Sequence, residues 1–285
     1  MGEINYKGFN KDMTCRDMQY KEGGNYETED ASACESGFHA CQYPLDCFGY
    51  YDPAHSVYHL VEQDGKLDYH KDDTKVASTK IKIGAEINIA GLVKAAIEYT
   101  QKRTKPEAKS DERCGASSAT GYKGASSATG YKGASSATGD YGASSATGNC
   151  GASSATGDYG ASSATGDCGA SSATGYKGAS SATGDYGASS ATGNCGASSA
   201  TGYKGASSAG DAESVAVAWG YHGRAKGVLG AYLVLADWEG DESKYWRQDS
   251  WTLKGAKMVR IDGEVIKADT YYTMKNGEIV EVEEE

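Results

Sequence analysis

Ten tandem copies of a nine-residue unit occupy residues 115–204 of the chain. Each copy reads Gly-Ala-Ser-Ser-Ala-Thr-Gly followed by two variable residues, and a degenerate copy begins at Gly205. The copies keep their register without an insertion, whereas a flexible Gly/Ser linker needs only composition. Two glycines in each copy would cost a helix about 2 kcal/mol relative to alanine. The stretch therefore predicts a repeat architecture rather than a linker or a helix.

A parallel β-solenoid fits the repeated unit best. The five residues between glycines can form a short strand, and Gly-x-x-Gly can turn the corner because glycine accepts a positive φ. Nine residues are too few for a closed coil, so each copy is expected to be half of an 18-residue coil. Ten copies then give about five coils, stacked over roughly 24 Å. The predicted fold class is mainly β, with a solenoid of two nine-residue repeats per coil between an N-terminal α+β domain and a C-terminal β-hairpin cap.

The second variable position supports the 18-residue coil. A nine-residue coil would stack Lys123 directly on Lys132, whereas the longer coil separates the lysines and places lysine beside tyrosine, where cation–π contacts form. Cys150 and Cys168 become neighbours, a candidate disulfide or thiol ladder. One predicted column of stacked turns contains Lys123, Tyr141, Tyr159, Lys177 and Cys195, and the other contains Cys114, Lys132, Cys150, Cys168, Tyr186 and Lys204.

The segment after the repeat suggests which side chains point inward. Val215, Val217 and Trp219 occupy the places of Ala, the second Ser and Thr in the repeat. Period-2 alternation then predicts an inward position for Ala116, Ser118 and Thr120 and their equivalents. The opposite phase stays open, and it would give a tighter Ser/Ala core with a threonine array outside.

The segment Ser214-Val-Ala-Val-Ala-Trp-Gly220, together with Ser-Ser-Ala-Thr-Gly, resembles the head repeats of trimeric autotransporter adhesins over residues 115–235. The resemblance implies a left-handed parallel β-roll and, for the family, surface adhesion by a trimer. Solenoids of this Ser-Ala-Thr-Gly style also resemble those of uncharacterised phage and prophage proteins of bacteria that carry a similar N-terminal domain. That likeness implies a phage or bacterial origin.

Charge and hydropathy exclude several classes of partner. The formal net charge of −11 over 285 residues argues against nucleic acid. The N-terminus lacks an apolar segment of signal-peptide length, and no run of 18 apolar residues predicts a membrane span. We therefore expect cytoplasmic synthesis, with release or incorporation into a virion left open. The eight cysteines are expected to be free thiols there.

The remaining chain divides around the repeat. Residues 1–106 predict an α+β domain, with strands near 6–9, 37–41, 56–61 and 75–83 and a helix over 89–103 that Asn88 caps. Residues 107–114 are expected to be a linker, 115–222 the solenoid and 223–285 a β cap. The cap should contain a strand over 231–236 and hairpins at Asp262-Gly263 and Asn276-Gly277. Trp238, Trp246 and Trp251 are expected to cover the open end of the solenoid.

Metal-binding residue types cluster in the N-terminal domain. Cys34, His39, Cys41 and Cys47 follow a C-x4-H-x-C-x5-C spacing, which is not a recognised zinc pattern. Buried free cysteines with a structural histidine explain these residues more simply. No metal and no other cofactor is predicted.

An enzymatic alternative rests on a second resemblance. The segments Tyr6-Lys-Gly-Phe9, 37–41 and 57–61 loosely resemble ADP-ribosyltransferase-like domains. The resemblance implies NAD binding near Lys7 or Arg16 and a late catalytic acid at Glu62 or Glu86. No catalytic residue is assigned, and a pocket that unites Arg16, His39 and Glu62 would favour this interpretation.

These observations favour a non-enzymatic repeat scaffold that binds a protein partner or another copy of itself. One alternative is an N-terminal effector, ADP-ribosyltransferase-like or nucleotide-binding, with the solenoid as a spacer. Another is ice binding, which outward rows of Thr120, Thr129 and Thr138 would favour. The candidate binding residues lie at the variable positions: Tyr122, Lys123, Tyr131, Lys132, Tyr141, Tyr159, Tyr176, Lys177, Tyr186, Tyr203 and Lys204.

Overall fold

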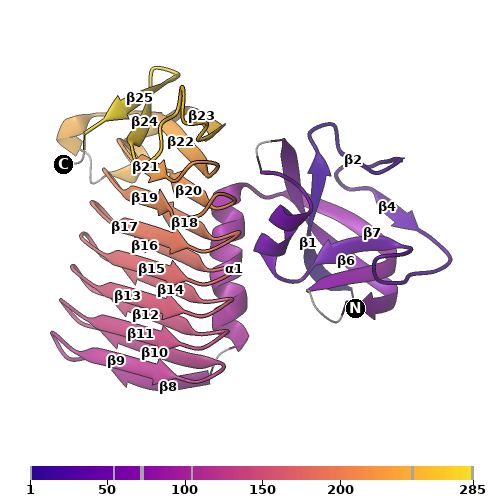
Figure 1. Cartoon of the computed structure of the whole chain (residues 1–285), viewed down its shortest axis with the longest axis horizontal. Coiled ribbons are helices and arrows are strands. Elements are labelled where there is room, and N and C mark those ends of the chain that lie inside the picture. The colour runs from indigo at the N-terminus through magenta and orange to yellow at the C-terminus, as the bar shows by residue number, and fades with distance from the viewer. Residues whose placement is uncertain (1, 54, 71–73, 104, 245–246, 284–285) are drawn as a thin grey trace. The chain divides into compact units, whose positions relative to one another are not determined.

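A computed structural model describes residues 2–53, 55–70, 74–103, 105–244 and 247–283. The chain divides into two compact units, residues 1–95 and 96–285 (Figure 1). Helix α1 (Ile89–Arg103) spans this division, and it has the bounds that the sequence predicted. The amide of Gly91 donates to Asn88 Oδ1 at 2.8 Å, which confirms the predicted N-terminal cap.

The second unit is a parallel β-solenoid made of two sheets. We call them the covered sheet and the open sheet. The covered sheet joins β8 (Lys105–Ser110), β10 (Gly124–Thr129), β12 (Ala143–Thr147), β14 (Ala161–Thr165), β16 (Ala179–Thr183), β18 (Ala197–Ala200), β20 (Val215–Ala218), β22 (Tyr232–Glu239) and β23 (Thr252–Arg260). The open sheet joins β9 (Ala116–Thr120), β11 (Ala134–Thr138), β13 (Ala152–Thr156), β15 (Ala170–Thr174), β17 (Ala188–Thr192), β19 (Ala206–Ala209), β21 (Arg224–Gly227), β24 (Tyr271–Lys275) and β25 (Glu278–Val282).

The register confirms a coil of two repeats. Ala134 pairs with Ala116 and with Ala152, so each strand lies on the strand 18 residues away. The ten repeats supply β9 to β18, the five coils expected from the sequence, and β8 and β19 to β22 extend the stack to about seven. Residues 107–110, expected as a linker, already belong to β8.

Each corner of the coil is a tight Gly-x-x-Gly turn. The amide of Gly160 donates to the carbonyl of Gly157 at 2.9 Å and closes the turn. The amide of Gly157 donates to Thr174 of the next coil, also at 2.9 Å. Gly157 has a φ of 139°, and a Cβ atom there would lie 2.1 Å from the carbonyl oxygen of Gly139. This glycine is therefore required both by its conformation and by the closeness of the neighbouring coil.

The predicted phase of the repeat is wrong. In β13, Ser153 and Ala155 are buried, whereas Ala152 and Thr156 are exposed. The valines that suggested the other phase lie in β20, where both faces are buried. Ala216 and Ala218 belong to the apolar cluster at the end of the solenoid, and Val215 and Val217 occupy the outward alanine and serine positions. The hydrophobic residues of β20 thus mark a covered outer face instead of the interior.

Buried serines form a continuous file of hydrogen bonds through the solenoid. Ser153 Oγ donates to Ser144 Oγ at 2.9 Å and accepts from Ser162 Oγ at 3.0 Å. The same contact recurs every nine residues and alternates between the sheets; the members of the file are Ser117, Ser126, Ser135, Ser144, Ser153, Ser162, Ser171, Ser180 and Ser189. Inward alanines beside the file complete a core of small side chains.

Residues 96–103 of α1 run beside the stack on the covered sheet (Figure 1). Ala96 and Thr100 are fully buried, and Thr100 Oγ1 donates to the carbonyl of Tyr159 at 3.2 Å. The outward alanines of the covered sheet are correspondingly buried, as Ala161 shows, while Ala152 of the open sheet is exposed. The outward alanines therefore reach solvent over several coils in the open sheet but not in the covered sheet, whereas outward threonines such as Thr147, Thr165 and Thr183 are exposed in the covered sheet as well.

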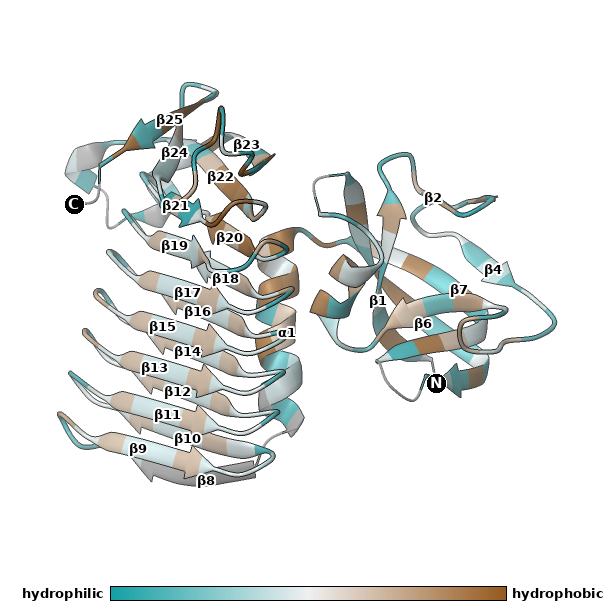
Figure 2. Cartoon of the chain, in the orientation of Figure 1, coloured by the Kyte–Doolittle hydropathy of each residue, from teal (hydrophilic) through white to brown (hydrophobic). Residues whose placement is uncertain are grey.

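Larger apolar residues close the C-terminal end of the solenoid. Strands β20 and β22 are more hydrophobic than the repeat strands below them (Figure 2). Leu233, Leu235, Ile261, Tyr272 and Met274 pack together on the last inward alanines. The predicted tryptophan cover is wrong for Trp238 and Trp251, which pack against Tyr203 and Tyr221 instead, and Trp246 lies outside the described residues.

One of the two predicted hairpins forms. Asn276 and Gly277 have φ values of 53° and 79° and connect β24 to β25. No hairpin forms at Asp262-Gly263: β23 ends at Arg260, and Asp262 Oδ1 accepts the amides of Glu264, Val265 and Ile266, each at 2.9 Å. The carboxylate thus holds amides that a second strand would need.

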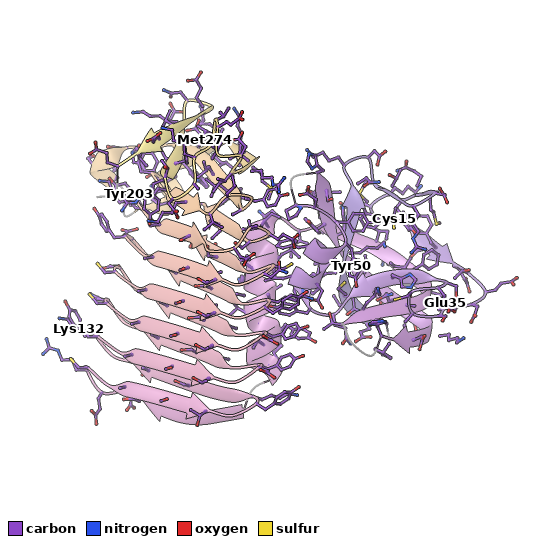
Figure 3. All side chains as sticks on the ribbon, viewed as in Figure 1. Cys15, Glu35, Tyr50, Lys132, Tyr203 and Met274 are labelled. Carbon is purple, nitrogen blue, oxygen red and sulfur yellow. The ribbon has the colours of Figure 1, made fainter. Side chains whose placement is uncertain are left out.

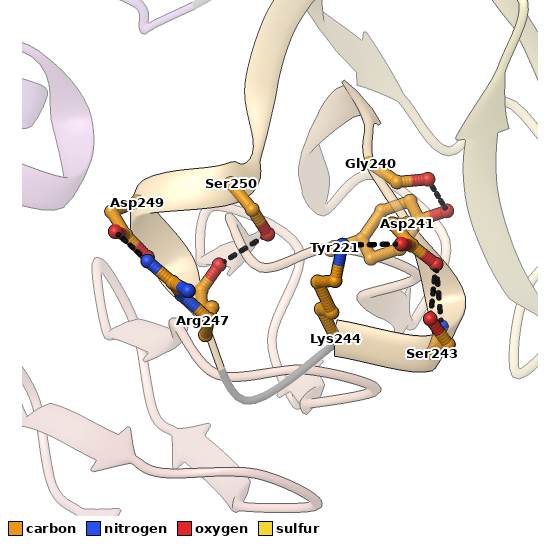
Figure 4. A network of polar contacts seen from close by, with 8 residues as sticks. All are labelled: Tyr221, Gly240, Asp241, Ser243, Lys244, Arg247, Asp249 and Ser250. Carbon is orange, nitrogen blue, oxygen red and sulfur yellow. Dashed lines mark hydrogen bonds and ion pairs between the residues drawn. The ribbon is translucent and has the colours of Figure 1, made fainter.

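The connection from β22 to β23 is held by local polar contacts (Figure 4). It contains two short 3₁₀ helices, η2 (Glu242–Lys244) and η3 (Gln248–Ser250). Lys244 forms an ion pair with Asp241 at 3.2 Å, and Arg247 one with Asp249 at 3.0 Å. Tyr221 Oη donates to the carbonyl of Gly240 at 3.2 Å, which fixes the connection to the last turns of the solenoid.

The first unit is a small closed β-barrel. Four antiparallel strands, β1, β5, β6 and β7, pair in a ring, because β6 contacts both β1 and β7 while β5 joins β1 to β7 on the other side. Its elements are β1 (Glu3–Asn10), β2 (Thr14–Cys15), β3 (Met18–Gln19), β4 (Asn25–Glu27), β5 (Phe38–Cys41), η1 (Pro44–Gly49), β6 (Ser56–Tyr69) and β7 (Lys75–Glu86). Strand β6 continues with a bulge through Asp64-Gly65 and thus extends well beyond the predicted range of 56–61.

Candidate functional site

The turns after the open-sheet strands form what we call the inner column. Its side chains stack as the 18-residue period predicted. The rings of Tyr141 and Tyr159 lie parallel with centroids 4.8 Å apart. Lys123 Nζ lies 5.7 Å from the ring centroid of Tyr141, and Lys177 Nζ lies 5.8 Å from that of Tyr159. Lysines at both ends of a tyrosine pair thus form the expected cation–π contacts.

The turns after the covered-sheet strands form the outer column. Lys132 and Tyr203 lie at this same edge of the stack (Figure 3). Tyr131 and Tyr186 are about half exposed, at 47% and 51%. Tyr203 is buried, because it packs with Tyr221 and Trp251 near the cap.

Not all of the predicted binding residues are accessible. Lys177 and Tyr203 are each 8% exposed and cannot present their side chains to a large partner. Tyr141, Tyr159 and Lys204 are partly buried. The exposed members are Tyr122, Lys123, Tyr131, Lys132, Tyr176 and Tyr186.

Cys150 and Cys168 are neighbours in the outer column, and both are exposed free thiols. Burial and the adjacent Cys150 thiol raise the pKa of Cys168. Lys132 separates Cys114 from this pair in the column.

The open sheet presents a regular face that the predicted phase concealed. We call its outward Ala, Ser and Thr residues in β9 to β19 the open face. A shallow groove of about 830 Å³ runs along the alanine and serine rows from Ala116 to Ser208. Lys226 and Tyr271 line its C-terminal end, with Lys226 Nζ 4.5 Å from the tyrosine ring centroid. Alanine and serine are so similar in size that the sequence offered no signal for this face.

A second cavity lies in the N-terminal barrel and has a volume of about 670 Å³. Lys7 comes to it from β1, Arg16 from the turn between β2 and β3, His39 from β5 and Lys75 from β7. Tyr50 and Tyr51, which follow η1, the carboxylates of Asp17 and Glu27, and the thiol of Cys15 add to its polar lining. Cys15 and Tyr50 are labelled in Figure 3.

Lys7 is the most deeply placed cation of this pocket. Alternation along β1 puts it on the same buried face as Asn5 and Phe9, a signal that the sequence already contained. Its Nζ donates to the carbonyl of His39 at 2.9 Å and to Cys15 Sγ at 3.4 Å. Tyr51 Oη donates to the same sulfur at 2.8 Å, and burial together with this bond raises the pKa of Tyr51.

His39 is held as a neutral acceptor. Its Nε2 accepts the backbone amide of Cys34 at 3.0 Å. Burial lowers the pKa of His39, and the positive charges of Lys7, Lys75 and Arg16 lower it further. Cys34, His39, Cys41 and Cys47 all line the pocket, yet the described residues contain no group of three His, Cys, Asp or Glu side chains that could hold a metal ion.

The residues of the enzymatic alternative are only partly brought together. Arg16 and His39 line the same pocket, whereas Glu62 lies on β6 with its side chain against Gly2. Glu86, at the end of β7, lies opposite His59 of β6 in the strand register and does not line the pocket.

Comparisons with known proteins inform only the first unit. Residues 4–95 match the model of a family described as a domain of unknown function, DUF7666. The match covers the barrel and ends within α1, before the solenoid begins. Neither the curated proteins nor the solved structures gave a significant match. No helix among the described residues has both the length and the apolar character needed to cross a membrane.

Proposed function

We propose that the chain is a non-enzymatic repeat scaffold that binds a regular, uncharged target along the open face. The observation that supports this most directly is the difference between the two sheets. The outward alanines of the covered sheet are buried beside α1, whereas those of the open sheet remain exposed in register over several coils. Rows of identical methyl and hydroxyl groups suit a target that itself repeats.

The area of the open face favours a polymer or an extended surface as the target, rather than a second copy of the chain. Six strands at about 4.8 Å spacing and five residues at about 3.3 Å give a face of roughly 24 by 13 Å, or about 300 Å². A stable protein dimer usually buries about 800 Å² on each partner. Self-association through this face alone should therefore be weak, while a long target can engage many molecules side by side.

The outer column extends the proposed surface at one margin. Tyr131, Lys132 and Tyr186 are exposed there, and tyrosine supplies rigid contact area that is partly apolar. The bacterial or phage origin implied by the sequence resemblance is part of this proposal.

Cosedimentation with insoluble cellulose and chitin tests the proposal. The variant Ala152→Lys/Ala170→Lys places two charged chains on the groove, where both alanines are exposed, and should abolish sedimentation with the polymer. Thr147→Lys/Thr165→Lys, at two exposed positions of the covered sheet, is the matched control. The proposal fails if the wild type binds neither polymer and stays monomeric in light scattering, or if the double variant binds as well as the wild type.

A second candidate function is ice binding, and the outward phase of the threonines favours it. Thr120, Thr138, Thr156, Thr174 and Thr192 are all exposed and stack in one row of the open sheet. Partition of the protein into slowly growing ice tests this function, with Thr156→Lys as the disrupting variant. Exclusion of the wild type from the ice would eliminate it.

A further inference from the structure

The pocket of the N-terminal barrel carries more positive than negative charge. Lys7, Arg16 and Lys75 line it, against the carboxylates of Asp17 and Glu27. Three cations and two anions leave a net charge of +1, in a chain whose net charge is −11. Glu27 is already paired with a surface lysine at 2.8 Å. The site therefore concentrates positive potential in an acidic protein.

Lys7 is a buried cation without a buried anion. It is 5% exposed, and its Nζ contacts only neutral acceptors, a carbonyl and a thiol, together with the rings of Phe9 and Tyr20. No carboxylate of the described residues forms an ion pair with it. A buried charge without a counter-charge is costly, and a bound anion would offset that cost.

Arg16 supplies a second, unengaged donor group. Within the described part of the chain its guanidinium forms no hydrogen bond and no ion pair. Its backbone has a φ of 52°, a conformation that non-glycine residues rarely adopt and that is frequent at functional sites. A guanidinium presents paired donors that match the two oxygens of a carboxylate or phosphate.

The size and walls of the pocket indicate more than a simple ion. A volume of about 670 Å³ lies in the range of sites for small organic ligands. Tyr50, which is 50% exposed, and the partly buried Tyr51 offer ring surface at the margin. Lys75 Nζ lies 4.5 Å from the ring centroid of Tyr50 and 3.1 Å from its hydroxyl. Cationic groups and ring faces thus line the same space.

We propose that this pocket binds a small aromatic anion, with its carboxylate or phosphate on Lys7 and Arg16 and its ring against Tyr50 and Tyr51. Lys7 holds the anionic group at depth, and Arg16 closes over it from the β2–β3 turn. Such binding is independent of the open face, so either proposal can fail while the other holds.

Isothermal titration calorimetry of the full chain tests the site with defined probes. Phenyl phosphate and benzoate carry a ring with different anionic groups, inorganic phosphate carries no ring, and benzyl alcohol carries no charge. At least one aromatic anion should bind with a stoichiometry of one, more tightly than phosphate or benzyl alcohol. Whichever of phenyl phosphate and benzoate binds more tightly shows whether the site prefers a phosphate or a carboxylate.

Two variants and a control locate the binding. Lys7→Met keeps the length of the side chain, and Arg16→Asn tolerates the left-handed backbone; each should weaken binding about ten- to a hundredfold. Lys66→Met removes an exposed lysine that pairs with Asp30 outside the pocket and should leave binding unchanged. Mass spectrometry should also show that the ligand protects Cys15, 3.4 Å from Lys7 Nζ, against iodoacetamide.

The proposal is overturned if neither aromatic anion binds, or if binding survives both Lys7→Met and Arg16→Asn. Equal affinity for phenyl phosphate and inorganic phosphate would eliminate the role of the ring. Arg16 is exposed, so Arg16→Asn remains informative even if Lys7→Met fails to fold.

Discussion

A serine in this solenoid has one of two roles, and its place in the repeat decides which. Ser153 lies in the buried file and Ser154, its neighbour in β13, faces outward. Ser153→Ala would leave the hydroxyl of Ser162 without its acceptor, because Ser162 donates to Ser153 at 3.0 Å. We expect a loss of about 1–3 kcal/mol in urea unfolding for Ser153→Ala and under about 0.5 kcal/mol for Ser154→Ala. Equal losses would show that the file contributes nothing specific.

His39 should make the barrel sensitive to acid. Its pKa in the folded chain lies below the ordinary value of 6.5, because burial and nearby cations disfavour the charged ring. As the pH falls, His39 therefore binds a proton in the unfolded chain before it does so in the folded chain. The stabilisation is complete above pH 6.5 and is lost as the pH falls through the lowered pKa.

The midpoints of urea unfolding, measured between pH 7.5 and pH 5, test this expectation, because histidine changes its charge in about this range. His39→Gln keeps an acceptor for the Cys34 amide and should lose less stability across this interval than the wild type. His55→Gln, at an exposed position, should follow the wild type. Parallel curves for the wild type and His39→Gln would contradict the prediction.

At the scale of the turn, two glycines of the same corner are not equivalent. Gly157 has a φ of 139°, and a Cβ atom added there would lie 2.1 Å from the nearest carbonyl oxygen. Gly160 does not have a positive φ, and a Cβ atom added there would lie 3.1 Å from the nearest carbonyl oxygen. Gly157→Ala should cost about 2–3 kcal/mol, and Gly160→Ala about 1 kcal/mol or less. Thermal unfolding followed by circular dichroism compares the pair. A larger loss for Gly160→Ala would contradict the turn geometry.

Neighbouring turns in the outer column should permit one specific disulfide. Strands one coil apart lie about 4.8 Å from each other, within the range of Cα separations that a disulfide spans. Mild oxidation with diamide should therefore join Cys150 to Cys168 within one molecule. Cys114, two coils from Cys150, should stay reduced. Peptide mapping of the oxidised protein identifies the linkage, and Cys168→Ser should abolish it.

Elements with a local cause could be predicted from the sequence. The repeat turns, the Asn88 cap and the Asn276-Gly277 hairpin each depend on residues next to one another in the chain. The Asp262-Gly263 hairpin failed because the Asp262 carboxylate captures three amides of its own turn. The predicted phase failed because β20 is buried on both faces, so that Val215 and Val217 mark a covered outer face and not the interior of the repeat.

At the scale of the molecule, the two candidate sites differ in how far the sequence could define them. The turn columns follow from the 18-residue period alone, so their composition was predictable. The barrel pocket gathers Lys7, Arg16, His39 and Lys75 from four separate segments, and only the ring of β1, β5, β6 and β7 brings them together. A motif search cannot find a site whose residues share no spacing.

The coil of two repeats makes a prediction about which deletions the whole molecule tolerates. Removing residues 151–168 deletes one complete coil, so every later strand stays in its own sheet and repeats the same ladder contacts. Removing only 160–168 deletes one strand and moves every later strand to the opposite sheet. Val215 and Val217 of β20 would then leave the covered sheet for the open one, and their buried outer positions would meet solvent.

We expect the 18-residue deletion to keep a single cooperative thermal transition close to that of the wild type, because repeat stability is nearly a sum over neighbouring coils. The nine-residue deletion should unfold at a clearly lower temperature, although it removes less of the chain. Circular dichroism melting of the two variants beside the wild type decides the matter. If the shorter deletion is the better tolerated one, the two sheets are interchangeable, and the distinction between a covered and an open face that underlies the proposed function is wrong.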